Sequence, residues 1–211
     1  MKLALFSFHI TDEHAVRLEK MVGKPLNESN VCFITTASNP YRDKEDEIPN
    51  WLQDTIDELE NLFEKVDLFD FTTRSKNFDF VSYFSEYDIV FIGGGNVFYL
   101  SYFMMKYGLY DVLNNLINDN SIVYSGGSAG AVILSETIEP YDSIDDPSDA
   151  PTQVNEGMNV IEFVPIVHWE DEKYFEKLKT VKDTYEDMGY LTITITDNEA
   201  LFIEDGKVDK I

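Results

Sequence analysis

Short apolar segments rich in β-forming residues alternate with segments of helical character, and no other feature limits the fold as strongly. Strands are expected at residues 2–8, 30–38, 66–71, 87–94, 121–127, 159–168 and 190–196. Helices are expected at residues 12–22, 47–66, 96–119 and 169–189, and from Ser128 onward. Because parallel strands joined by right-handed helical crossovers build a doubly wound sheet, the sequence predicts an α/β fold with a mostly parallel sheet flanked by helices. An Asp205–Gly206 turn predicts a hairpin at the end of this single domain, residues 1–211.

The charge of the chain argues against several classes of partner. The 16 basic and 40 acidic residues give a formal net charge of -24, which repels nucleic acid and anionic membranes. No apolar run reaches the roughly 18 residues of a membrane span, and the first residues are expected to form a strand rather than a signal peptide. The single cysteine, Cys32, is expected to be a buried thiol in a reducing compartment. We therefore expect a cytoplasmic monomer or homodimer.

A glycine corner, Gly-Gly-Ser-Ala-Gly at residues 126–130, follows the fifth expected strand and precedes helix-forming residues. It fits the G-x-S-x-G nucleophile elbow in the strand-to-helix context that this motif requires. The small flanking residues would let strand and helix approach, so that Ser128 stands at the sheet edge and the Ala129 amide faces an oxyanion. A plain glycine-rich turn with Ser128 as a helix cap is the alternative.

A second glycine run, residues 93–95, ends the fourth expected strand. A dinucleotide fingerprint would need glycine at Phe98, and a P-loop would need a Gly-Lys-Ser/Thr ending, so nucleotide binding is disfavoured. The bare amides of the run could instead donate to a carbonyl oxygen from the side opposite Ala129. The alternative is a tight turn in which Asn96 caps the next helix.

A serine nucleophile needs a base and an acid that orients it. Of the three histidines, His14 lies in a charged helix and His9 has no base-orienting neighbour, whereas His168 ends an expected strand and is the best base. Glu199 follows the strand at 190–196 and is the preferred acid. The competing acids lie in the loop after the elbow, as in the chain order of α/β-hydrolases: Asp142, Asp145 and Asp146.

These residues resemble the serine peptidases of family S51, which includes dipeptidase E and cyanophycinase. The matching segments are GGGNVFYL at 93–100, GGSAGA at 126–131, the strand-end His168 and DNEAL at 197–201. The resemblance implies a class I glutamine amidotransferase-like fold. A glutamine amidotransferase itself would have cysteine where this chain has Ser128, so that activity is not expected.

The same resemblance implies roles for particular residues. It implies a catalytic triad of Ser128, His168 and Glu199. It also implies an oxyanion hole formed by the amides of Gly95 and Ala129, with Asn96 near the substrate.

One segment departs from the family pattern. Dipeptidase E enzymes that cut after an aspartate resemble one another in having an arginine in the segment that follows the elbow. This chain has Glu139 at the comparable place, and its three arginines all precede the elbow. A fork-shaped donor for a substrate carboxylate is therefore missing locally. We expect dipeptidase-like hydrolysis of another short peptide, whose free ammonium the acidic loop at 139–149 would hold.

No cysteine and histidine cluster has metal-ligand spacing, so neither a metal nor a cofactor is expected. Two other functions are compatible with these residues. One is an esterase or amidase with the same triad, and the other is a non-catalytic ligand-binding protein of the same fold.

Overall fold

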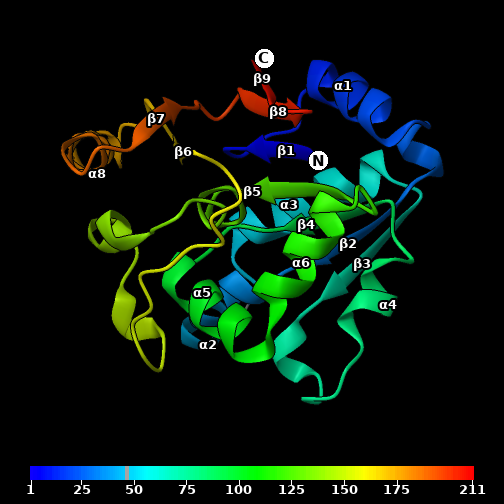
Figure 1. Cartoon of the computed structure of the whole chain (residues 1–211), viewed down its shortest axis with the longest axis horizontal. Helices are drawn as coiled ribbons and strands as arrows, with labels where there is room; N and C mark the ends of the chain where they lie inside the picture. Colours follow the sequence, from blue (N-terminus) through cyan, green and yellow to red (C-terminus); the bar gives the residue numbers. More distant parts are fainter. Residues whose placement is uncertain (46–47) are drawn as a thin grey trace.

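A seven-stranded sheet forms the centre of the protein in the computed structural model, which describes residues 1–45 and 48–211 (Figure 1). The strand order is β3-β2-β4-β5-β1-β8-β9. The strands are β1 Lys2–Phe6, β2 Asn30–Ile34, β3 Lys65–Phe69, β4 Ile89–Ile92, β5 Val123–Gly127, β8 Ala200–Glu204 and β9 Lys207–Lys210. Strands β1 to β5 pair in parallel, whereas β8 is antiparallel to β1 and forms the predicted terminal hairpin with β9. The predicted fold class is confirmed.

Helices cover both faces of this sheet, because successive side chains along a strand point to opposite faces. In β1, Ala4 and Phe6 pack in one apolar layer, whose helices are α1 Asp12–Val22 and α3 Asn50–Leu62. Leu3 and Leu5 belong to the opposite layer. Its helices include α4 Phe80–Phe84, α5 Val97–Tyr107, α6 Leu109–Asn118, α7 Ala129–Val132 and α8 Phe175–Asp187.

A separate two-stranded parallel sheet consists of β6 Phe163–Ile166 and β7 Leu191–Thr194. In Figure 1 these strands and α8 are grouped to one side of the large sheet. The sequence predicts both strands but not that they leave the main sheet. They cannot pair with the free side of β1, because β8 already occupies that side.

Several local features differ from the sequence-based expectations. The Asn39–Pro40 pair is expected to end the second strand, but β2 ends earlier, at Ile34. Helix α2 Asn39–Glu45 begins at this pair, since proline is tolerated in the first turn of a helix. Thr11, rather than the expected Asp12, caps α1 by accepting a hydrogen bond from the amide of His14. By contrast, the interruption that Gly108 predicts in the helical segment at 96–119 is present, since its φ of 70° ends α5. Glu47, at the start of the second expected helix, lies outside the described residues.

Short 3-10 helices occupy several connections. They are η1 Leu26–Glu28, η2 Thr36–Ser38, η3 Phe71–Thr73, η4 Glu139–Ser143 and η5 Pro147–Asp149. The last two organise the acidic loop that the sequence suggests is irregular. None of the helices in the described part of the chain has the length and apolar character that crossing a membrane requires.

Candidate active site

Ser128 occupies a strained turn between β5 and α7. Its φ of 49° and ψ of -111° lie in a region that costs a non-glycine residue roughly 1–3 kcal/mol. The Ser128 amide donates to the carbonyl of Phe6 over 3.0 Å, and its own carbonyl accepts from the amides of Ala131 and Val132 at 2.9 and 3.1 Å. These bonds hold the turn in the strand-to-helix geometry that the glycine corner predicts.

The glycines around Ser128 are required by close backbone packing. A Cβ atom on Gly130 would lie 2.0 Å from the carbonyl oxygen of Ile92, and one on Gly126 would lie 2.4 Å from the carbonyl oxygen of Gly130. Neither contact can be relieved by turning a side chain, because the obstructing atoms are backbone. The close approach of α7 to β4 depends on Gly130, and its approach to β5 depends on Gly126.

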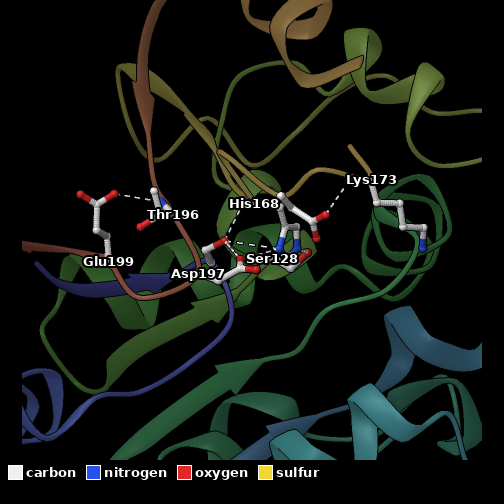
Figure 2. Close-up of polar contacts among 8 residues, drawn as sticks. Ser128, His168, Lys173, Thr196, Asp197 and Glu199 are labelled. Carbon is white, nitrogen blue, oxygen red and sulfur yellow. Dashed lines mark hydrogen bonds and ion pairs between the residues drawn. The ribbon is translucent and has the colours of Figure 1, made fainter. Parts of the chain in front are cut away.

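His168 connects the Ser128 hydroxyl to a carboxylate. Its Nε2 lies 2.9 Å from Ser128 Oγ, and its Nδ1 lies 2.7 Å from Asp197 Oδ1 (Figure 2). An ionised carboxylate only accepts hydrogen bonds, so Nδ1 carries the proton and Nε2 is left to accept the serine proton. Burial opposes ionisation of Asp197, but hydrogen bonds from His168 and Ser7 hold its pKa below the usual value.

The sequence favours Glu199 as the acid, but in the described structure Glu199 makes no contact with His168. In Figure 2 its carboxylate turns away from His168 toward Thr196, whose amide donates to Oε2 over 2.9 Å. Lys210 lies 2.9 Å from the same oxygen. Asp197, two residues earlier, takes the place assigned to Glu199, because the turn after β7 brings position 197 against the imidazole. The acid is still supplied after the histidine, and none of the alternative aspartates of the 139–149 loop bonds to His168.

The two glycine segments meet at Ser128. Gly94, Gly95 and Ala129 line the same pocket as Ser128. A Cβ atom on Gly94 would lie 3.3 Å from Ser128 Cβ, so the run at 93–95 packs directly on the serine. Within residues 1–45 and 48–211, the amides of Gly95 and Ala129 donate to no protein acceptor. Both are available to a ligand in the pocket.

Asn96 is fully buried and holds structure together instead of facing the pocket. Its Oδ1 accepts from the amide of Tyr99 over 2.9 Å and caps α5. Its Nδ2 donates to Asp146 O at 2.8 Å and to Asp149 Oδ2 at 3.3 Å. The resemblance implies that Asn96 lies near the substrate. The structure instead engages both ends of its side-chain amide, one in the helix cap and one in the acidic loop.

The pocket beside Ser128 has a volume of about 370 Å³. Much of its wall is aromatic, from Phe8, Tyr41, Trp51, Phe91, Tyr141 and Tyr174. Besides His168 and Asp197, its charged lining residues are Asp145, Asp171 and Lys173. Glu139, expected to set specificity, is exposed and borders a different hollow beside α8, so it does not reach this pocket in the described structure.

Asp145 is the residue of the acidic loop that reaches the pocket. Its Oδ2 accepts from the amide of Val97 over 2.9 Å, and Tyr41 also bonds to it. Burial raises the pKa of Asp145 to about 6, against the lowering effects of the Val97 amide, His168 and Tyr41. The pocket therefore holds a carboxyl group that gains its charge near neutral pH.

Sequence reasoning missed two residues of this constellation. Asp197 appears in the sequence as part of the Asp197–Asn198 turn, and its position directly after a strand was a usable signal. Ser7, which bonds to both His168 and Asp197, gives no such signal, because 161 and 190 residues separate it from these partners. No group of three or more histidine, cysteine, aspartate or glutamate residues in the described structure is placed to hold a metal ion.

A doubly wound sheet with a serine, histidine and aspartate in hydrogen-bonded series at its strand ends is typical of hydrolases that use a serine nucleophile. The family model for peptidase family S51 matches residues 5–211, and the chain belongs to this family. The family that the glycine motifs indicate is thereby confirmed, and the protein is an enzyme of a peptidase family.

Relatives support the same assignment. An uncharacterized peptidase, Lmo0363, of Listeria monocytogenes is 26% identical over 184 residues, which cover 87% of this chain and 86% of the relative. Lin0382 of Listeria innocua, also an uncharacterized peptidase, is 27% identical over 186 residues, 87% of this chain and 84% of its own.

Solved structures share the fold. A crystal structure of a protein described as a peptidase E, from Listeria monocytogenes EGD-e, superposes with a TM-score of 0.81 at 25% identity and covers 100% of this chain and 97% of its own. A peptidase from an acI-B1 Actinobacterium gives a TM-score of 0.58 at 18% identity, covering 100% of this chain and 86% of its own.

Proposed function

We propose that the protein hydrolyses short peptides by acyl transfer through Ser128, His168 and Asp197. One observation carries the proposal: Ser128 Oγ, the His168 ring and Asp197 Oδ1 form an unbroken series of contacts at 2.9 and 2.7 Å. Membership of a peptidase family supports an amide bond as the target.

The proposed reaction follows from these contacts. His168 Nε2 takes the hydroxyl proton as Ser128 Oγ attacks the scissile carbonyl carbon. The carbonyl oxygen becomes an oxyanion, which the free amides of Gly95 and Ala129 stabilise. His168 then gives its proton to the leaving amine, and the peptide C–N bond breaks. Water, deprotonated by the same nitrogen, releases the acyl group and restores the serine.

The pocket supports a small substrate with a free amino terminus. A volume of about 370 Å³ lies at the lower end of the range for small-ligand sites, so it suits one or two residues better than a long chain. Asp145 and the aromatic rings of Tyr41 and Trp51 offer a carboxylate and π-faces, which together attract an ammonium group. Among the described lining residues there is no arginine, so an aspartyl side chain lacks a bidentate partner.

The test is labelling and turnover in matched variants. Wild-type protein should react with a fluorophosphonate at Ser128 and should cleave members of a dipeptide and tripeptide panel varied at the first residue. Ser128→Ala should abolish labelling and lower turnover by several orders of magnitude. Ser143→Ala, on the exposed acidic loop, is the control and should behave as wild type.

Three results would contradict the proposal. Peptidase activity that survives Ser128→Ala would remove the serine mechanism. Labelling without peptide cleavage, accompanied by ester turnover, would favour an esterase with the same triad. A folded wild-type protein that neither labels nor cleaves would favour a ligand-binding protein.

A further inference from the structure

Ser7 lies immediately after β1, where the main sheet meets the unit that carries His168 and Asp197. Its side chain is fully buried. Its Oγ is 2.7 Å from Asp197 Oδ1 and 2.6 Å from the amide nitrogen of His168, with His168 Nδ1 at 3.4 Å. One hydroxyl therefore contacts both residues that would act on Ser128, although it does not contact Ser128 itself.

The direction of these hydrogen bonds is determined by chemistry. The His168 amide can only donate, so Ser7 Oγ accepts from it. The ionised Asp197 carboxylate can only accept, so the hydroxyl proton of Ser7 points to Oδ1. Asp197 Oδ1 consequently receives two donors, the Ser7 hydroxyl and His168 Nδ1, and both restrain the position of this oxygen.

The bond to the His168 amide has a second consequence. His168 has a φ of 55°, a conformation that is unfavourable for a residue with a side chain. A backbone in this conformation persists only where its surroundings hold it, and the Ser7 hydroxyl is the partner of its amide. Its ring is thus aimed at Ser128 by a contact from a different sheet.

We propose that Ser7 is a positioning residue of the active site, which locks the His168 backbone and the Asp197 carboxylate in register with Ser128. This inference rests on the proposed function, since it concerns the efficiency of the same serine. Ser7 lines the pocket, but its hydroxyl is engaged by Asp197 and by the His168 amide, so its removal should affect activation of Ser128 more than substrate affinity.

The experiment compares variants at Ser7 with a matched buried serine. Ser125 on β5 pairs in register with Ala4 of β1 and is also fully buried. Among the residues that the structure describes, its hydroxyl bonds only to the carbonyl of Ala4, at 3.3 Å. Ser7→Ala, Ser7→Thr, Ser7→Cys and Ser125→Ala are compared by fluorophosphonate labelling rate, kcat and KM on the best peptide, and melting temperature.

Ser7→Ala should label roughly tenfold more slowly and lose a similar factor in kcat with KM unchanged, because a hydrogen bond to a charged group is lost. Ser7→Thr keeps the hydroxyl and should recover most of the rate. Ser125→Ala should label at the wild-type rate even if its melting temperature falls. A merely structural role would lower the melting temperature of Ser7→Ala and Ser125→Ala alike and leave both labelling rates unchanged.

Folded Ser7→Ala protein with wild-type labelling and kcat would overturn the inference while leaving the proposed function in place. A change in KM alone would also overturn it. Should Ser7→Ala not fold, Ser7→Cys carries the test, because a thiol is a weak donor, and an unchanged labelling rate in that variant is equally decisive. A wild-type protein that does not label overturns the proposed function itself and this inference with it.

Discussion

Replacing Asp197 by asparagine tests the site more sharply than any other single change, because a triad with Asp197 and a triad with Glu199 predict opposite effects on kcat. Asp197→Asn keeps the shape of the side chain and removes its charge. With charge centres about 4 Å apart and an effective dielectric constant near 20, the attraction to an imidazolium is about 4 kcal/mol. Since Asp197 is about one third exposed, at 35%, solvent screening reduces this value. A loss of roughly 2–3 kcal/mol corresponds to a kcat lower by about 30-fold to 160-fold.

Glu199→Gln is the matched comparison. Its amide oxygen can still accept from Thr196, whereas the ion pair with Lys210, in which both side chains are about one third exposed, is lost. Such pairs contribute about 0–1 kcal/mol to stability, so kcat should change less than roughly threefold. The assay is kcat and labelling rate for both variants side by side. Equal losses in the two variants, or a loss in Glu199→Gln alone, would refute the reasoning and return Glu199 to the role that the sequence suggested.

Three further predictions concern the pocket and the glycine corner. The ratio of cleavage rates for free-amine and N-acetylated peptides should fall as the pH drops through about 6, because Asp145 is protonated there, and Asp145→Asn should make this ratio low and independent of pH. A ratio that stays constant in wild type would contradict the ammonium site. Gly130→Ala should destabilise the fold by about 1–3 kcal/mol in urea titration, since its Cβ would meet the carbonyl of Ile92, and an unchanged midpoint would contradict that clash. Glu139→Arg should give no gain on Asp-X dipeptides, because Glu139 borders a separate hollow, and a clear gain would show that it reaches the site.

The main sheet was predictable because its signals are local. Strands β1, β2, β4 and β5 are apolar segments buried on both faces, and α3 and α5 carry apolar residues at helical spacing, so each element could be recognised without its partners. The departure of β6 and β7 from that sheet was not predictable in this way. It depends on β8 occupying the edge of β1, and pairing at a sheet edge is decided by tertiary contacts that no single segment contains.

The site residues also divide into those that a local sequence signal indicates and those that depend on tertiary contacts. The five adjacent residues 126–130 indicate Ser128, and a position at the end of an apolar strand indicates His168. The choice between Asp197 and Glu199 depends on the direction of a short turn, in which the Glu199 amide bonds to the carbonyl of Thr196 over 3.0 Å. A shift of two residues in such a turn changes which carboxylate meets the imidazole, and composition does not distinguish the two.

The separation of the site between two sheets has a physical consequence. Ser128 belongs to the main sheet, whereas His168 and Asp197 follow β6 and β7. The amide of His9 donates to the carbonyl of Asp197 over 3.1 Å, and with the Ser7 contacts this bond ties the end of β1 to the smaller unit. His168 and Asp197 therefore form one body, which contacts from the end of β1 hold against Ser128. A displacement of that body would lengthen the contact between His168 and Ser128 first, because the contact between His168 and Asp197 lies within it.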